Sequence, residues 1–196
     1  MTDKETLDAY ATRVDDYIAI TKAEPAVSLV AFADALPEGG RVLDLGCGPG
    51  HAAKYLASRG FAAHAWDASP EMVAAAKAPG VTTRIAVFED LAETATYDGV
   101  FASFSLLHAP RADFPRHMAA IARAIKPGGV FHLGMKTGTG EERDSIGRFY
   151  SYFTRDELVA EMEANGLNPV WEQTGEEPGL SGTVAPFVLI RAVKSA

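Results

Sequence analysis

Two hydrophobic patterns alternate along the chain from residue 41 onward. Short apolar and β-branched runs predict strands at 41–45, 61–66, 82–88, 99–104, 130–135, 167–172 and 183–193. Apolar positions at helical spacing predict helices at 52–58, 69–77, 113–125 and 153–166, and residues 2–36 also have a helical pattern, punctuated at Pro25. This alternation predicts an α/β fold, with a mainly parallel sheet covered by helices on both faces.

Polar residues and glycines at the ends of these runs predict where the helices begin and stop. Ser69 followed by Pro70 is a typical helix start, and Asp113 and Thr154 occupy equivalent capping positions. Gly60 and Gly166 follow the last apolar positions of two helices and predict their ends.

Three glycines follow the first predicted strand, in the segment VLDLGCGPGHAAKYLASRG. Gly46, Gly48 and Gly50 remove side chains where the strand becomes a helix, which favours close approach of a ligand to the backbone. In such sheets ligands bind at the carboxyl ends of the strands, so we expect the ligand at this turn.

The spacing of the turn excludes one nucleotide-binding motif and disfavours another. A phosphate-binding loop of NTPases needs Lys and then Ser or Thr after its last glycine, whereas His51 follows Gly50 here. In the dinucleotide fingerprint the third glycine position would be His51, so that fit is poor. Asp44, two residues before Gly46, would repel a pyrophosphate and suits an ammonium group, directly or through water.

Acidic residues at two further strand ends predict the remaining parts of the ligand. Asp67 ends the second strand, where an acid binds the two hydroxyls of a ribose. Glu89 and Asp90 follow the third strand, where a side chain or amide would contact the amine of an adenine. Amino acid, ribose and adenine together predict S-adenosylmethionine.

Composition and charge limit the cellular location and the binding partners that we expect. The 196 residues suit one domain, with 47% apolar and 22% charged residues and a net charge of −8. An acidic surface disfavours nucleic acid. Cys47 is the sole cysteine, so no internal disulfide forms, and no apolar run is long enough for a membrane span. The polar first residues predict a cytoplasmic protein.

Five motifs in order carry a family resemblance: VLDLGCGPG, AWDASPEMVAAAK, FEDL, YDGVFASFSLLH and IKPGGVFHL. The chain resembles class I S-adenosylmethionine-dependent methyltransferases from about Tyr10 to its end. The resemblance implies a single domain over 1–196, with 1–38 as a helical lead-in. It also implies a Rossmann-like three-layer sandwich whose seven-stranded sheet has the order 3-2-1-4-5-7-6 and an antiparallel last strand.

The resemblance further implies small-molecule methylation, without nucleic acid or a membrane as partner. The Asn/Asp-Pro-Pro-aromatic turn of DNA and protein amide methyltransferases is absent from SFSLLH. No acidic metal trio of the catechol type is evident, so no metal is predicted. The acceptor atom stays open. Two other functions also stay open. One is a methyltransferase-like binding protein without catalysis. The other is a nicotinamide-dependent oxidoreductase, which is disfavoured by Asp44 and by the missing third glycine of the dinucleotide fingerprint.

Candidate cofactor contacts lie in and beside these motifs. For the glutamate–aspartate pair, the family favours Asp90 over Glu89 as the adenine contact. Met72 packs either in the core or against the adenine, and Cys47 is expected as a small turn residue rather than a nucleophile. Tyr10 or Tyr17 closes over the methionine end or packs in the core. The full set is Tyr10, Tyr17, Asp44, Gly46, Cys47, Gly48, Gly50, Asp67, Ala68, Met72, Glu89, Asp90, Leu91 and Phe104.

Candidate acceptor contacts follow the fourth and fifth strands. His108 is a packing residue at the cofactor or a weak candidate for a catalytic base. The segment KTGTGEERDSIGRFYSY is either a solvated loop or the acceptor pocket. Its cations predict an anionic small-molecule acceptor, with Arg148 the foremost contact. The candidate residues are His108, Lys136, Arg143, Arg148 and Tyr150.

Overall fold

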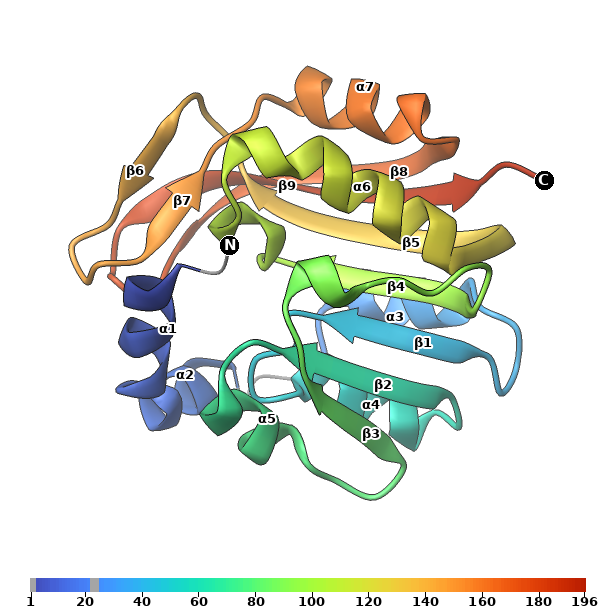
Figure 1. The fold of residues 1–196 in the computed structure, drawn as a ribbon, viewed down its shortest axis with the longest axis horizontal. Helices are drawn as coiled ribbons and strands as arrows, with labels where there is room; N and C mark the ends of the chain where they lie inside the picture. Colours follow the sequence, from blue (N-terminus) through green and yellow to red (C-terminus); the bar gives the residue numbers. More distant parts are fainter. Residues whose placement is uncertain (1–2, 22–24) are drawn as a thin grey trace.

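The computed structural model describes residues 3–21 and 25–196, which fold around one seven-stranded sheet of order β3-β2-β1-β4-β5-β9-β8 (Figure 1). The strands are β1 Arg41–Leu45, β2 Ala62–Asp67, β3 Val81–Ile85, β4 Tyr97–Ser103, β5 Ile125–Lys136, β8 Leu167–Pro178 and β9 Val184–Lys194. β9 runs antiparallel to both of its neighbours, and the other pairs are parallel. Since β8 and β9 are the sixth and seventh strands of this sheet along the chain, the expected strand order is confirmed.

Helices cover both faces of the sheet (Figure 1). On one face, α3 Val27–Asp34 and α4 His51–Ser58 pack Phe32 and Leu56 against β1 and β4. On the other face, α6 Phe114–Ala124 and α7 Arg155–Ala164 pack Ile121 and Leu158 into the larger core. α5 Pro70–Ala76 packs along β2 and β3. Among the described residues, no helix has the length and apolar character to cross a bilayer.

Helix ends confirm two of the three predicted caps. The Ser69 hydroxyl accepts the Met72 amide, and Thr154 forms a reciprocal capping box with Glu157. Asp113 occupies the N-cap position of α6, but its side chain makes no capping hydrogen bond, so that part of the prediction is wrong. Its backbone is helical (φ −90°, ψ −17°) because a short 3₁₀ turn runs directly into the helix.

The third and fifth strands differ from their predicted bounds. β3 ends at Ile85, and Phe88 instead opens the 3₁₀ helix η1 Phe88–Asp90. β5 begins at Ile125, so the Lys-Pro-Gly-Gly segment that ends α6 is already strand. Pairing of Tyr97 with Ile125 shifts register before Gly99 pairs with Val130, and this irregularity accommodates the proline and glycines.

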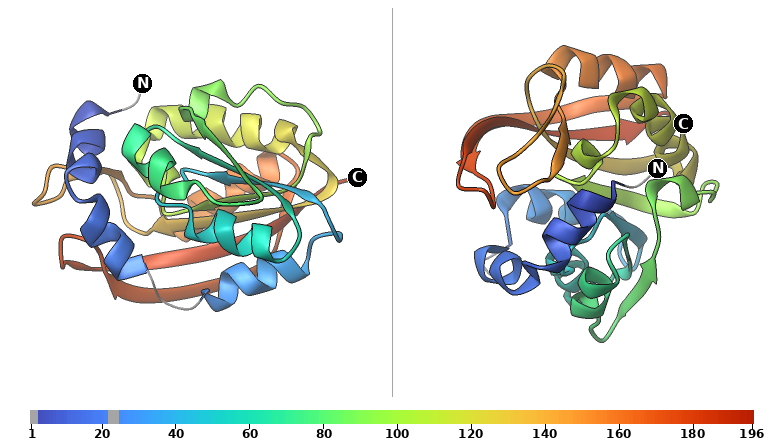
Figure 2. Two further views of the ribbon diagram at one scale, coloured as in Figure 1. Left: turned by 90° about the horizontal axis from the view of Figure 1, so that it is seen from below. Right: turned by 60° about the vertical axis from the view of Figure 1, so that its left-hand side comes forward.

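The segment after β5 forms a two-stranded antiparallel ribbon, β6 Glu141–Arg143 and β7 Phe149–Ser151. The helical lead-in divides into α1 Lys4–Ala11, α2 Val14–Thr21 and α3. Figure 2 shows α1 and α2 at the same end of the molecule as the ribbon. The Asp3 carboxylate accepts two bonds from the Arg143 guanidinium, at 2.9 and 2.6 Å, and the Thr6 hydroxyl accepts the Phe149 amide at 2.8 Å. The ribbon therefore fixes α1 over the carboxyl ends of the strands.

Candidate functional site

A cavity of about 900 Å³, counted with its open mouth, lies at the carboxyl ends of β1, β2 and β4 beneath α1 and α2. This is the edge where a parallel sheet of this kind binds ligands. Ten of the predicted site residues line it: Tyr10, Tyr17, Gly46, Gly48, Asp67, Ala68, Met72, Glu89, Phe104 and His108.

The glycine turn brings bare backbone to the cavity wall. Gly46 and Gly48 have φ of 75° and 52°, in the left-handed region that side chains disfavour. A Cβ on Gly46 would lie 2.3 Å from the Cβ of Ser105. A Cβ on Gly48 would point at the ring of Tyr17, 3.3 Å away. The glycines are therefore required both by the turn and by the close packing around it.

Cys47 and Gly50 belong to the same turn but do not line the cavity. The Cys47 thiol is buried, its pKa is raised by that burial, and it donates to the Gly48 carbonyl. This environment suits a small turn residue rather than a nucleophile. A Cβ on Gly50 would lie 2.7 Å from the Cβ of Ala76, so this glycine lets α4 and α5 approach.

Asp67 ties the glycine turn to the end of β2. Its Oδ2 accepts the Gly48 amide at 2.8 Å, and its Oδ1 accepts the Ser69 amide at 2.9 Å. Burial raises the pKa of this carboxyl, and the amides oppose that shift. Asp67 is thus a largely buried carboxylate that shapes the turn and faces the cavity.

Asp44 lies behind the turn and does not line the cavity. It is 4% exposed, and its Oδ2 accepts the Ala53 amide at 3.0 Å. Burial raises its pKa to about 7, and the charge of Asp67 adds to the shift. A cationic group near Asp44 would reverse the shift by stabilising the carboxylate.

The two acids after β3 point to different places. Glu89 lines the cavity, whereas the Asp90 carboxylate turns back to accept the Val87 amide at 3.0 Å. Met72 is 2% exposed and reaches the wall from α5. Leu91 is buried in the main core, away from the wall. Glu89 is thus better placed than Asp90 to contact a ligand.

Phe104 lines the cavity in a strained backbone conformation. Its φ of 54° is left-handed, which costs a residue other than glycine about 1–3 kcal/mol. Its amide donates to the Gly134 carbonyl at 2.8 Å, and its ring meets the edge of Phe187. Strain of this kind at the end of β4 turns the chain into the cavity wall.

His108 and Tyr10 meet at the cavity although they are far apart in sequence. The Tyr10 hydroxyl lies 2.9 Å from His108 Nε2, and His108 Nδ1 lies 2.7 Å from the Phe149 carbonyl. Burial lowers the pKa of His108 to about 4. The imidazole is therefore neutral at neutral pH.

The predicted acceptor residues of the ribbon segment lie outside the cavity wall. Arg143 is exposed and paired with Asp3, so it fixes α1 instead of facing a ligand. Arg148 is 2% exposed and donates to the Tyr10 hydroxyl. Lys136 and Tyr150 are also buried, with the ammonium 4.8 Å from the ring centre.

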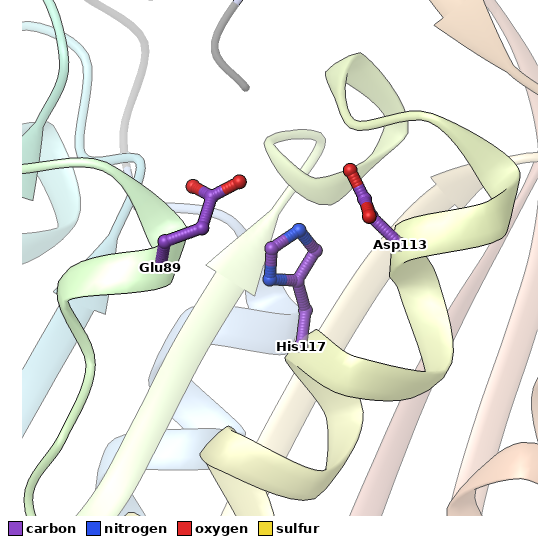
Figure 3. A group of neighbouring side chains, drawn as sticks. All are labelled: Glu89, Asp113 and His117. Carbon is purple, nitrogen blue, oxygen red and sulfur yellow. The ribbon is translucent and has the colours of Figure 1, made fainter.

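Glu89, Asp113 and His117 form a further cluster, with ligand atoms within 4.8 Å of one another. Figure 3 shows the His117 ring between the two carboxylates. Carboxylates and an imidazole suit a divalent cation. Arg116 already lies 3.2 Å from Glu89 and 3.1 Å from Asp113, which neutralises part of their charge. The expectation that no metal is needed stays a prediction.

Sequence reasoning missed several residues of the cavity wall. His117 was detectable, because it shares the buried face of α6 with Phe114, Met118 and Ile121 at helical spacing. The residues of α1 and of the β4 end gave no local signal. The missed set is Asp3, Thr6, Leu7, Leu45, Ser69, Ala86, Val87, Phe88, Ser103, Ser105, Ala109, Pro110 and His117.

Comparisons with known proteins agree with this architecture. Residues 42–129 match the family described as Methyltransferase domain. A trans-aconitate 2-methyltransferase of Mycolicibacterium gilvum is 37% identical over 91 residues, 45% of this chain and 35% of that protein. A ubiquinone biosynthesis O-methyltransferase of Xanthomonas oryzae pv. oryzae is 37% identical over 103 residues, 48% of this chain and 42% of that protein. The matches thus span less than half of these relatives.

A solved structure matches over nearly the whole chain. The 1,6-didemethyltoxoflavin-N1-methyltransferase of Burkholderia thailandensis, with bound 1,6-didemethyltoxoflavin and S-adenosylhomocysteine, has a TM-score of 0.76. It is 21% identical and covers 98% of this chain and 88% of that one. At this identity the match shows a shared fold.

Proposed function

We propose that this chain, whose residues 42–129 match the methyltransferase domain family, transfers a methyl group from S-adenosylmethionine to a small-molecule acceptor. The observation that carries the proposal is the cavity at the glycine turn, with Asp67 and Glu89 on its wall and buried Asp44 behind it. Bare backbone, a carboxylate for ribose and one for adenine suit this cofactor better than a dinucleotide. The relatives acting on small molecules support the same class of acceptor.

Methyl transfer requires little from the protein beyond positioning the acceptor and the methyl group. A sulfonium methyl is already activated, so the site needs to align the acceptor behind the methyl group and exclude water. α1 and α2 cover the cavity, and the ribbon fixes α1 there, which supports a water-excluding role for the lead-in. The step breaks the sulfur–methyl bond, leaves that electron pair on sulfur and forms a bond from the acceptor atom.

An anionic group on the acceptor is the finer part of the proposal. Lys136 is 9% exposed and has no hydrogen-bond or ion-pair partner among the described residues. Burial and the charge of Arg148 lower the pKa of Lys136, so a nearby anion would stabilise the charged ammonium form of Lys136. Neither side chain lines the cavity wall, but Arg148 is already paired with Asp144, which leaves Lys136 the better supported contact for an acceptor group that reaches past the wall.

Cofactor binding is tested first, and turnover is tested second. Thermal unfolding is followed with S-adenosylmethionine, S-adenosylhomocysteine or NAD, since a ligand at a hundredfold excess over Kd stabilises by about 2.7 kcal/mol. We expect stabilisation by the first two only. Stabilisation by NAD alone would overturn the proposal.

Turnover is then measured by mass spectrometry with trans-aconitate and with 3,4-dihydroxybenzoate. Lys136→Met should raise the acceptor KM and leave cofactor affinity unchanged, with Lys126→Met, whose ammonium pairs with Asp98 away from the cavity, as the matched control. Cofactor binding without methylation of any compound in a metabolite screen would favour a binding protein without catalysis. Equal effects of the two variants would contradict the anion contact.

A further inference from the structure

The hydrogen bonds around His108 fix the position of every proton in a buried chain. A carbonyl only accepts, so Nδ1, 2.7 Å from the Phe149 oxygen, carries the hydrogen of the neutral ring. Nε2 then holds the lone pair and accepts from the Tyr10 hydroxyl. A guanidinium only donates, so Arg148 Nη1 donates to the Tyr10 oxygen at 3.0 Å. The chain therefore runs in one direction, from Arg148 through Tyr10 to His108.

The far end of this chain is held rigidly. The Asp144 carboxylate accepts from Arg148 Nε at 3.0 Å and from Nη2 at 2.7 Å. The guanidinium also lies 5.3 Å from the ring centre of Tyr10, which restrains the ring as well as the hydroxyl. Tyr10 and His108 line the cavity, whereas Arg148 and Asp144 lie behind them. The arrangement presents one functional oxygen to the cavity.

That oxygen has capacity left for a ligand. A phenolic oxygen accepts two hydrogen bonds and donates one. Tyr10 donates to His108 and accepts from Arg148, and no other described residue occupies its second lone pair. An acceptor O–H or N–H in the cavity can therefore donate to Tyr10.

We propose that Tyr10 relays a proton from a protic acceptor to His108 during methyl transfer, with Arg148 as a positioning residue. The inference rests on the proposed function. As the acceptor atom bonds to the methyl carbon, the carbon–sulfur electron pair goes to sulfur. The acceptor proton passes to the Tyr10 oxygen, and the Tyr10 proton passes to His108 Nε2. Tyr10 ends neutral, His108 ends as imidazolium, and the extra proton then leaves to solvent.

The electrostatics suit a proton that arrives only during the reaction. His108 is faced by Tyr10 from α1, by Lys136 from β5 and by Tyr150 from β7. Arg148 and Asp144 face it from the turn between β6 and β7. Burial and the two cations keep the imidazole neutral and able to accept. Loss of the sulfonium charge as imidazolium forms leaves the net charge of the site unchanged.

The test compares an acceptor that must lose a proton with one that has none to lose. At pH 7 the hydroxyls of 3,4-dihydroxybenzoate are protonated, whereas trans-aconitate is a carboxylate. We expect Tyr10→Phe to lower kcat for 3,4-dihydroxybenzoate about a hundredfold, within the range of general acid–base catalysis. Turnover of trans-aconitate should fall at least tenfold less, because its carboxylate has no proton to lose. Tyr152→Phe is the matched control, since its hydroxyl donates to Glu142 on the ribbon.

Nitrogen-15 NMR of the His108 imidazole tests the relay in the absence of any acceptor. Wild-type His108 should show the Nδ1–H tautomer down to about pH 5, and Tyr10→Phe should shift the Nε2 resonance. An Nε2–H tautomer, or a Tyr10→Phe enzyme that loses equal activity with both acceptors, would overturn the relay. Full activity of Tyr10→Phe with the phenolic acceptor would do the same. Failure of cofactor binding instead overturns the proposed function, and the NMR result is unaffected by it.

Discussion

Cofactor affinity should depend on pH through Asp44. This carboxyl is 4% exposed, and burial raises its pKa to about 7 while the Ala53 amide supplies a single hydrogen bond. A ligand ammonium nearby needs the ionised form, so binding must remove the proton from Asp44 wherever it is present. Affinity should therefore fall as pH falls below about 7.

The magnitude follows from the fraction of Asp44 that is ionised in the empty site. With a pKa near 7, about half is ionised at pH 7 and roughly 3% at pH 5.5, so Kd should rise about 16-fold, or ~1.6 kcal/mol. An α-amino group with a pKa of about 7.7–8.0 stays mostly charged over this interval, by more than about 80% even at pH 7. His108, with a pKa of about 4, titrates below it.

Isothermal titration calorimetry with S-adenosylhomocysteine, from pH 5.5 to 7 in buffers of different ionisation enthalpy, measures both Kd and proton release. Nearly one proton should be released at pH 5.5 and about half a proton at pH 7, as the ionised fractions require. Asp44→Asn should bind more weakly at pH 7 with little dependence on pH. A wild-type Kd that is constant over this range, without proton release, would refute the role given to Asp44.

Three further outcomes are expected. Asp67→Ala should weaken cofactor binding at least tenfold by calorimetry, because it also releases the Gly48 amide, whereas Asp90→Ala should not, and equal affinities would contradict the ribose contact. Gly48→Val should abolish binding while circular dichroism shows a retained fold, and normal binding would place the site elsewhere. His132→Leu should raise the free energy of unfolding by about 1 kcal/mol at pH 7, because both buried ring nitrogens lack partners among the described residues. Burial lowers the pKa of His132 to about 3, so wild-type stability falls as pH drops below about 6.5, and urea titrations of the variant should show less of this loss.

The sequence by itself determined the features that depend on neighbouring residues. Alternating apolar periods located the strands and helices, because each period is a property of the local backbone. Ser69 was recognisable as a cap since its partner, the Met72 amide, is three residues away. The glycine turn and the acids at the strand ends followed from the shared edge of a parallel sheet.

The tertiary structure decided which side chains face one another. Tyr10 meets His108 across 98 positions and Arg148 across 138, and neither distance has a local signature. Glu89 and Asp90 are adjacent acids in sequence, and the turn at Val87 directs one to the cavity and the other to the backbone. Arg143 is bound by Asp3, which no spacing rule relates to it. Such contacts depend on how the N-terminal helices and the ribbon dock at one end of the sheet, so they exist only once the whole chain has folded.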